Sequence, residues 1–405
     1  MAQTVDLLYS DTERTLAAAL ADLLSSRAQA PDVLARTEQP DTYDLDLWHA
    51  VAADIGLAGL LIPEALGGAG ASYRELAAAA EQFGATVAPI PYLGSAAVAT
   101  AAALSAAKSS AQRTEPGPVS PAADLLRHLA DGELTAVLAV PAATLPGGPF
   151  PVAVRVAGAA DGGMTTLRGT IRSVADALPA DILLVPAEGV PNALYLVEAS
   201  APGVHRTPVT SLDMTRQLCD VSLDGAPARQ VAVGAAAEAA LDAGLMAGAA
   251  VLAAEELGLA QRCLDMTVAY LKERRQFARP IGSFQALKHR LADLWTTITL
   301  ARAASRYAVA CLADGDPDAP VAVALAKSAC GEAAVAAAQE CVQLHGGIGF
   351  TWEHPAHLYL KRAKASSVLF GTPGAHRAAL ATLVNLPAPG ALRRAGARPR
   401  QTWSV

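Results

Sequence analysis

Apolar residues in the first quarter of the chain recur at steps of three and four residues, which is the period of an amphipathic helix. In the stretch LDLWHAVAADIGLAGLLIP, Leu45, Trp48 and Val51 fall on one face, and we predict a helix that ends at Ile62, before a proline. Residues 1 to about 108 therefore predict a mainly helical unit with one turn-rich interruption.

The interruption is a glycine-rich stretch, GGAGAS, after which a second helix is expected. Ser72 is suited to cap that helix, with Glu75 three residues later at the position that completes a capping box. The segment SSAQRTEPGPVSP at residues 109–121 is polar and proline-rich, so it predicts a loop or linker that closes the N-terminal unit.

The pattern changes between about residues 130 and 230. Short apolar runs (LTAVLAV, DILLVPA, ALYLVEA and DVSLDG) alternate with Gly, Pro and Asp clusters, which are strand and turn signals. Because no helical stretch lies between these runs, they predict a compact antiparallel sandwich or barrel and contain no Rossmann unit.

Helical periodicity returns from residue 235 to about 385, and the last twenty residues are rich in Pro, Gly and Arg. The fold class is therefore α+β. We predict an N-terminal all-α domain at 1–125, a middle β domain at 126–232, a C-terminal helical bundle at 233–388 and a tail at 389–405.

Composition limits the partners and the compartment. Lys and Arg are scattered and the net charge is -7, so the chain offers no surface suited to nucleic acid. It begins without a basic stretch followed by an apolar core, and it shows no uninterrupted membrane-length run, so we expect a cytoplasmic protein with no membrane segment. Five cysteines without a CxxC pair predict buried thiols in a reducing compartment: Cys219, Cys263, Cys311, Cys330 and Cys341.

Three motifs stand in order in the last third of the chain: RRQFARPIG from Arg274, Phe284-Gln285, and QLHGGIGF from Gln343. In the first third, GLLIPE, GGAG and EQFG add to them. Together they resemble the acyl-CoA dehydrogenase family of flavoproteins, and in particular subunits of heteromeric steroid side-chain acyl-CoA dehydrogenases. The resemblance implies an N-terminal helical domain, a middle β domain and a C-terminal four-helix bundle.

The resemblance also implies FAD as the cofactor. In the family, the Arg and Phe of the R-x-x-F motif contact the flavin dinucleotide, often across a dimer interface. A guanidinium offers paired donors to a pyrophosphate, and glycines let the backbone approach a cofactor closely. Taken singly, each such residue would be an ordinary surface charge or helix stop, and only their joint occurrence is specific. The expected FAD contacts are Arg274, Gln276, Phe277, Gln285, Gln343, Gly346, Gly347 and Thr372.

Aromatic and histidine residues after the glycine motif invite comparison with a metal site. Trp352, His354, His357 and Tyr359 have no acidic or thiolate set to complete one, so we expect no metal and interpret them as packing residues. Glu64 is similarly expected to fix a turn.

The family reaction removes a proton beside the thioester carbonyl while the next carbon gives hydride to the flavin, so it needs a base. The resemblance implies a glutamate just before the last Gly-Thr or on the helix leading into the R-x-x-F motif. Here Phe370 and Gly248 stand at these positions. Ala249 stands where the family usually has an arginine near the CoA-binding end of the pocket.

Two segments that normally hold the flavin ring also depart from the family pattern, at residues 139–142 and 173–176. Glu255 and Glu256 are the fallback candidates for a relocated base. However, Glu255 lies roughly 10 Å along the helix from Gly248, and a helix-face or interface pair is the favoured interpretation of both glutamates.

Three functions remain open. The chain is the base-lacking subunit of a heteromeric acyl-CoA dehydrogenase, or a self-sufficient homo-oligomeric dehydrogenase or oxidase, or a structural subunit without cofactor. The expected partners are a second acyl-CoA dehydrogenase-like subunit or further copies, an acyl-CoA thioester, and electron-transfer flavoprotein or a similar acceptor. The long Ala-rich helices predict at least a dimer and favour a dimer of dimers.

Overall fold

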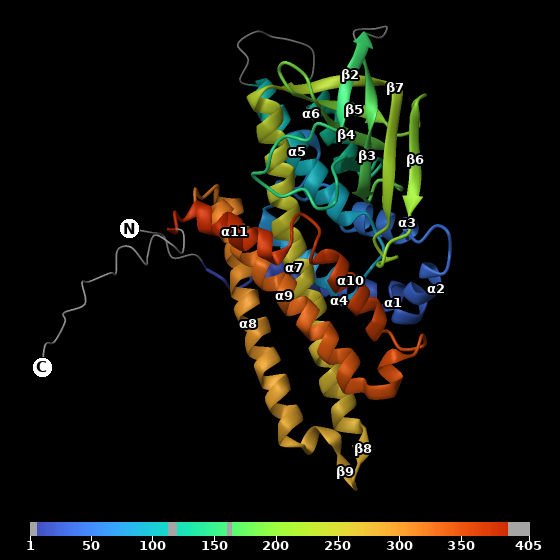
Figure 1. Ribbon diagram of the computed structural model, residues 1–405, viewed down its shortest axis with the longest axis vertical. Helices are drawn as coiled ribbons and strands as arrows, with labels where there is room; N and C mark the ends of the chain where they lie inside the picture. Colours follow the sequence, from blue (N-terminus) through green and yellow to red (C-terminus); the bar gives the residue numbers. More distant parts are fainter. Residues whose placement is uncertain (1–5, 112–119, 160–163, 388–405) are drawn as a thin grey trace, which may run out of the picture.

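The computed structural model describes residues 6–111, 120–159 and 164–387, and helices, strands and helices follow one another in that order (Figure 1). The N-terminal helices are α1 (Asp11–Arg27), α2 (Ala30–Thr37), α3 (Leu45–His49), α4 (Tyr73–Thr86), α5 (Thr100–Ala111) and α6 (Pro121–Ala130). Shorter helical turns lie between them: η1 (Ala50–Asp54), η2 (Glu64–Leu66) and η3 (Leu93–Ala99). Glu64 opens such a turn, as expected.

The predicted helix from residue 45 to 62 is wrong in its second half. Helix α3 passes into the π-helical turn η1 and ends at Asp54, because Gly56 adopts a left-handed backbone with φ +75°. The apolar residues after it, Leu57 to Ile62, are still buried but in turns.

The capping prediction at Ser72 is confirmed. The Ser72 hydroxyl accepts from the Arg74 N–H at 3.1 Å, and Glu75 Oε2 accepts from the Ser72 N–H at 2.9 Å. The predicted linker at 109–121 is only partly testable, because α5 continues to Ala111, and residues 112–119 lie outside the described residues.

The middle unit is a seven-stranded mixed sheet. Its strands are β1 (Ala136–Leu138), β2 (Val154–Ala159), β3 (Thr165–Ala175), β4 (Ile182–Ala187), β5 (Ala193–Glu198), β6 (Val204–Val209) and β7 (Leu218–Val233). The order is β1-β4-β5-β7-β3-β2, and β6 also pairs with β7. Leu167, Ile171, Leu183 and Val221 belong to the sheet's own apolar core.

The predicted antiparallel sandwich or barrel differs from the structure in two details, the direction of one strand pair and the absence of barrel closure among the described residues. Strands β1 and β4 pair in parallel, because the chain runs through β2 and β3 before it returns beside β1. Within the described residues the sheet does not close into a barrel, because its strand order begins at β1 and ends at β2, and only an isolated bridge between Arg155 and Glu188 links β2 to the chain after β4. The other strand pairs are antiparallel, as predicted.

The C-terminal unit contains α7 (Ala235–Glu273), α8 (Gln285–Asp314), α9 (Ala319–His345), α10 (Ala356–Ser366) and α11 (Pro373–Leu383). A short hairpin, β8 (Arg275–Gln276) and β9 (Arg279–Pro280), and the turn η5 (Ile281–Ser283) connect α7 to α8, and the turn η6 (Gly346–Phe350) follows α9. Two helices in the described chain, α7 and the run Ala319–Phe350, are long and apolar enough to cross a membrane. Their most apolar windows are 61% and 67% buried inside the protein, which fits core helices.

Small residues allow these helices to pack closely. A Cβ on Gly258 of α7 would lie 1.8 Å from the Glu81 carbonyl oxygen of α4, and a Cβ on Gly84 would lie 1.9 Å from the Glu255 carbonyl oxygen. The two helices therefore cross backbone to backbone, and glycine is required at both points.

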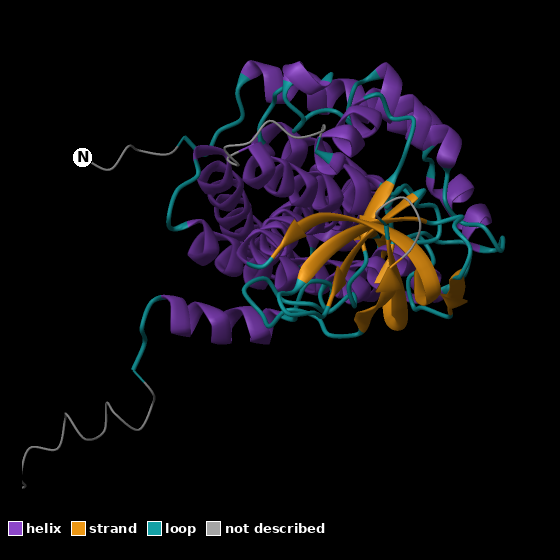
Figure 2. Ribbon diagram, turned by 90° about the horizontal axis from the view of Figure 1, so that it is seen from above, coloured by secondary structure: helices purple, strands orange, loops and turns teal. Residues whose placement is uncertain are grey.

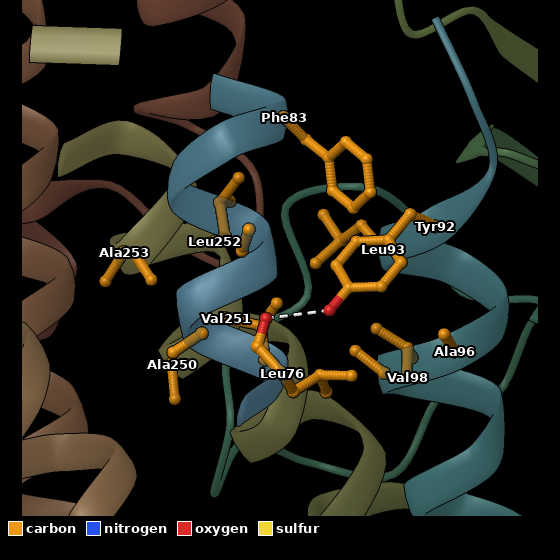
Figure 3. Close-up of a cluster of buried hydrophobic side chains, with 14 of the residues drawn as sticks. Leu76, Phe83, Tyr92, Leu93, Ala96, Val98, Ala250, Val251, Leu252 and Ala253 are labelled. Carbon is orange, nitrogen blue, oxygen red and sulfur yellow. Dashed lines mark hydrogen bonds between the residues drawn. The ribbon is translucent and has the colours of Figure 1, made fainter. Parts of the chain in front are cut away.

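Apolar side chains of α4, η3 and α7 meet in the core shown in Figure 3. The hydroxyl of Tyr92 donates to the Leu76 carbonyl at 2.7 Å, and the Phe83 and Tyr92 rings lie 4.6 Å apart. This core fixes η3, and with it Val98, against α7. The sheet covers one side of the helical mass, as the view in Figure 2 shows. The domain boundaries stay a prediction, and the tail at 389–405 lies outside the described residues.

Candidate active site and cofactor-contact residues

The two positions at which a base was expected touch each other. Gly248 lies within α7, and a Cβ placed on it would be 2.8 Å from Cε2 and Cζ of Phe370 and 2.8 Å from Cγ2 of Val98. The Phe370 ring is 6% exposed. An aromatic ring therefore fills the space beside Gly248, and neither position supplies a carboxylate. Ala249, the next residue of α7, is fully buried.

The backbone of Phe370 is held on both sides. Its N–H donates to the Ala142 carbonyl at 2.8 Å, and its carbonyl lies 2.9 Å from Nε2 of His376. Burial, together with the charge of Lys327, lowers the pKa of His376 to about 4. A neutral imidazole that donates from Nε2 satisfies this carbonyl, because the carbonyl oxygen can only accept.

Glu255 is a buried carboxylate with both oxygens engaged. Oε2 accepts from Arg216 Nη2 at 2.6 Å, and Oε1 accepts from Arg362 Nε at 2.8 Å. Burial alone would raise its pKa, but the charges of Arg216 and Arg362 outweigh burial and lower the pKa of Glu255 to about 2. A carboxylate of this kind is a weak base, and each of its oxygens already accepts a hydrogen bond from a guanidinium group.

Glu256 is buried as well, but its environment is different. Lys327 Nζ donates to Glu256 Oε1 at 2.7 Å and to the Ser366 carbonyl at 2.9 Å. Burial raises the pKa of Glu256 to about 7, against the opposing charge of Lys327. Its Oε2 has no hydrogen-bond partner within the described chain. This carboxylate faces α9, where a Cβ on Gly331 would lie 3.7 Å from Oε2, and it does not border Gly248.

The pair therefore differs from the favoured sequence interpretation. Glu255 and Glu256 are 3% and 1% exposed and form ion pairs inside the chain, so they do not form an exposed helix-face pair, and their contact with a partner stays a prediction. Both lie about 10–12 Å along α7 from Gly248, given the rise of 1.5 Å per residue. Their use as a relocated base stays untested.

The expected dinucleotide contacts gather at one end of the helical bundle. Arg274 ends α7, and Phe277 lies in the turn of the β8–β9 hairpin, 84% exposed and with φ +52°. The rings of Tyr270 and His345 stack with centroids 4.5 Å apart, so the end of α7 and the end of α9 lie together. The other expected contacts at this end are also exposed: Gln276, Gln285, Gln343, Gly346 and Gly347.

Thr372 is separate from that group. It caps α11, where its hydroxyl accepts from the Ala375 N–H at 3.1 Å. In Figure 1 the β8–β9 hairpin projects from the lower end of the molecule, whereas α11 lies above the middle. Within one chain, the β8–β9 hairpin and the Phe370–Thr372 segment therefore lie apart and cannot contact the same end of a cofactor.

The two flavin-ring segments meet at the ends of β1 and β3, where the Ala142 N–H donates to the Ser173 carbonyl at 3.0 Å. Asp176 is buried and accepts from the Tyr43 hydroxyl at 2.8 Å, so it ties the sheet to the N-terminal helices. A cavity of about 270 Å³ lies beside these segments. Its lining includes Ala142, Ala175, Arg216, Ser366 and Leu369.

The residues compared with a metal site pack against one another. Trp352 and His357 stack at 4.6 Å, His345 and His354 lie at 4.4 Å, and the Tyr359 hydroxyl donates to the Ala85 carbonyl at 2.9 Å. Among the described residues no group of three or more His, Cys, Asp or Glu side chains could hold a metal ion. All five cysteines are free and buried, so the prediction of buried thiols is confirmed.

Comparison with known proteins agrees with this architecture. Residues 10–117 match the model of the acyl-CoA dehydrogenase N-terminal domain, and residues 237–384 match that of the acyl-CoA dehydrogenase C-terminal domain. The chain belongs to the acyl-CoA dehydrogenase family. It is 35% identical over 366 residues to the acyl-CoA dehydrogenase IpdE2 of Mycolicibacterium smegmatis, covering 90% of this chain and 96% of that protein.

Solved structures of acyl-CoA dehydrogenases have the same fold. A variant of the Tcur3481-Tcur3483 steroid ACAD matches with a TM-score of 0.78 and 30% identity, covering 94% of this chain and 99% of that one. The ChsE4-ChsE5 complex from Mycobacterium tuberculosis matches with a TM-score of 0.80 and 28% identity, covering 95% and 100%. Butyryl-CoA dehydrogenase from Megasphaera elsdenii, at 21% identity and a TM-score of 0.80, covers 94% of this chain and 100% of its own and shows the fold alone.

The acyl-CoA dehydrogenase family uses FAD, and the residues present fit this cofactor at both ends. A Cβ on Gly346 or Gly347 would meet no atom within 4 Å, so the backbone there is open to close approach. At the cavity, Nε and Nη1 of the buried Arg216 have no hydrogen-bond partner in the described chain, and the pyrimidine edge of a flavin carries acceptors for such donors.

Sequence reasoning missed the charged residues that surround the two glutamates. Lys327 stands in the apolar run VALAKSAC, and a lysine inside a buried helix signals a paired charge. Arg216 and Arg362 carry no comparable signal, because each comes from a separate segment of ordinary polarity. Only the fold brings them to Glu255.

Proposed function

We propose that this acyl-CoA dehydrogenase is the base-lacking subunit of a heteromeric enzyme. It contributes Arg274, Phe277 and the Gly346-Gly347 backbone to a flavin dinucleotide, while a partner subunit supplies the carboxylate that removes the proton next to the thioester carbonyl. The observation that carries this proposal is the contact between Phe370 and Gly248, since it leaves both family base positions without a carboxylate.

The exposed end of the bundle supports the other half of the proposal. The β8–β9 hairpin, which follows Arg274 and carries Phe277 in its turn, lies at the lower end of the molecule in Figure 1, away from α11, which begins directly after Thr372. The flavin that Arg274 and Phe277 would contact therefore belongs to a second subunit. Arg274 would bind the pyrophosphate through its fork of donors, and Phe277 would pack on the adenosine end. When bound, FAD supplies the acceptor for the hydride that leaves the neighbouring carbon.

Relatives guide the substrate and the acceptor. One similar solved structure is described as a steroid ACAD, and another is a complex of two different chains. We therefore propose a steroid-derived acyl-CoA thioester as substrate, electron-transfer flavoprotein or a similar carrier as acceptor, and a heterotetramer in the cytoplasm. This substrate assignment rests on analogy between related folds.

Reconstitution tests the proposal. The chain is purified alone, and together with an acyl-CoA dehydrogenase-like partner that carries a glutamate at one of the two family positions. We expect negligible turnover for the lone chain, full turnover for the complex, and a loss of about 10²- to 10⁴-fold when the partner glutamate becomes glutamine, because the proton then has no positioned acceptor. Full turnover of the lone chain would contradict the heteromer.

A self-sufficient enzyme is the second candidate, and the pKa of about 7 at Glu256 is the observation that favours it, since a base works best near the operating pH. Under that candidate, Glu256→Gln abolishes turnover of the lone chain while FAD remains bound. A lone chain and a complex that both lack flavin absorbance would instead indicate a purely structural subunit.

A further inference from the structure

We infer that Phe370 is a built-in plug of the acyl cleft, so that this subunit takes up no acyl thioester until the ring is removed. The inference rests on the proposed function, because a plugged cleft explains why substrate binding is left to the partner. It goes further than the loss of a base, since a cleft that lacks only its base would still bind substrate.

The location of the reacting carbons follows from the two base positions. A general base must come within about 2.6–3.2 Å of the proton-bearing atom. Carboxylates extending from residues 248 and 370 would converge on the same small volume, since these residues are already in contact. The reacting end of a thioester therefore belongs where Cε2 and Cζ of Phe370 now lie, 2.8 Å from a Cβ at Gly248.

The plug is held although its backbone is unfavourable. Phe370 has φ +57°, a left-handed conformation that strains a residue with a Cβ. Its N–H donates to Ala142 and its carbonyl accepts from His376, so hydrogen bonds on both sides keep the ring directed at Gly248 and Val98. Surrounding structure that maintains a strained residue in this way indicates a role for its side chain.

The loop after β1 covers the same place from outside. Leu145 Cδ1 would lie 2.4 Å from a Cβ on Gly371, and the Gly147 N–H donates to Asp242 of α7 at 2.6 Å. This loop thereby bridges α7 and the segment that carries the plug. The flavin-side cavity has Ala142 and Leu369 in its lining but neither Gly248 nor Phe370, so it does not open into the acyl position.

The test compares binding of butyryl-CoA and of coenzyme A by titration calorimetry, on the full chain. Phe370→Gly removes the ring and suits the left-handed backbone, and a four-carbon acyl group approximates the volume that the ring vacates. We expect no binding tighter than about 1 mM for the wild-type chain. We expect Phe370→Gly to bind butyryl-CoA at least roughly tenfold more tightly than wild type, and more tightly than it binds coenzyme A.

Phe83→Ala is the matched control. This residue is also buried, 2% exposed, and its ring packs on Tyr92 in the core between α4 and η3, so its loss should lower stability without creating butyryl-CoA binding. If Phe370→Gly does not fold, Phe370→Ala, which keeps a Cβ in the apolar contact, takes its place in the same titration.

Three outcomes overturn the plug: wild type binds butyryl-CoA as tightly as the variant, a folded variant gains no affinity, or butyryl-CoA and coenzyme A bind the variant equally. These results are independent of the reconstitution. If turnover requires the partner and the wild-type chain nevertheless binds butyryl-CoA, the plug is rejected and the proposed function stands. An active lone chain rejects the proposed function instead.

Discussion

The interior around Gly248 and the exposed end of the bundle differ in the side chains that they present: the first is filled by an apolar ring, and the second exposes polar and aromatic side chains. At Gly248 an apolar ring fills the place where the family resemblance implies a catalytic carboxylate. At the other end, Arg274 ends α7 and Phe277 lies in the exposed turn of the β8–β9 hairpin. A buried base position depends on the side chains that pack around it, whereas exposed contact residues depend on a second chain. The proposed loss of the base is therefore compatible with retention of the exposed FAD-contact residues. Each prediction below probes one side of this difference.

The largest effect is expected inside, at Glu255. Glu255→Gln removes one carboxylate from a cluster that holds the guanidinium groups of Arg216 and Arg362 away from water. Breaking a buried ion pair by removing one partner typically costs about 3–5 kcal/mol. Chemical denaturation should show this loss. Glu238→Gln changes an exposed glutamate in the first turn of the same helix and should lower the free energy of unfolding by about 1 kcal/mol or less.

Glu255 also makes the free energy of unfolding depend on pH. Since the pKa of Glu255 is lowered in the fold to about 2, its contribution to stability is complete above the ordinary carboxyl pKa of 4.5. It is lost as the pH falls from there towards 2, and Glu255→Gln should flatten this part of the stability profile. A variant that is as stable as wild type but inactive would make Glu255 a catalytic group instead.

The next effect belongs to the exposed end. Arg274→Met should leave the melting temperature of the lone chain unchanged, because the side chain is exposed. In the complex it should weaken FAD binding by about 10- to 100-fold, since a hydrogen bond to a charged group contributes about 1.5–3 kcal/mol. Flavin retained after dilution and gel filtration measures this loss.

Arg275→Met is the matched control, because Arg275 is the exposed neighbour that lies outside the R-x-x-F positions. Equal flavin loss in the two variants would indicate a general charge effect. Unchanged FAD affinity in Arg274→Met would remove the hairpin from the cofactor site.

The same two regions show how far sequence reasoning reaches. The capping box at Ser72 and Glu75 was predictable because it is local, as were the long helices and the strand-rich middle. The end of α3 at Gly56 was missed, since the apolar period continues through residues that are buried in turns. Parallel pairing of β1 with β4 depends on the path of the chain between them, which periodicity does not encode.

For the site, the motif positions themselves are readable, but their mutual distances are not. The family motifs place Phe370 and Gly248 at the two positions where a base is expected. Only the fold brings the Phe370 ring against Gly248. The cluster around Glu255 depends on Arg216 before β7 and Arg362 on α10. Contacts between segments so distant in sequence follow from tertiary structure and from no local pattern.

The smallest effect is expected at Glu256, because its raised pKa of about 7 keeps the carboxyl largely protonated below pH 7, so that a neutral glutamine replaces a largely neutral group. Because the fold raises the pKa of Glu256 to about 7, the folded chain keeps a proton that the unfolded chain releases near the ordinary value of 4.5. Its contribution therefore falls as the pH rises from about 4.5 to 7, and stability decreases with pH in that window through this residue. Glu256→Gln removes the titration, so the free energy of unfolding of the variant should rise relative to that of wild type between about pH 4.5 and 7. A difference that stays constant from pH 5 to 7 would mean that the Glu256–Lys327 pair is ionised throughout, and it would remove the physical basis for Glu256 as a relocated base.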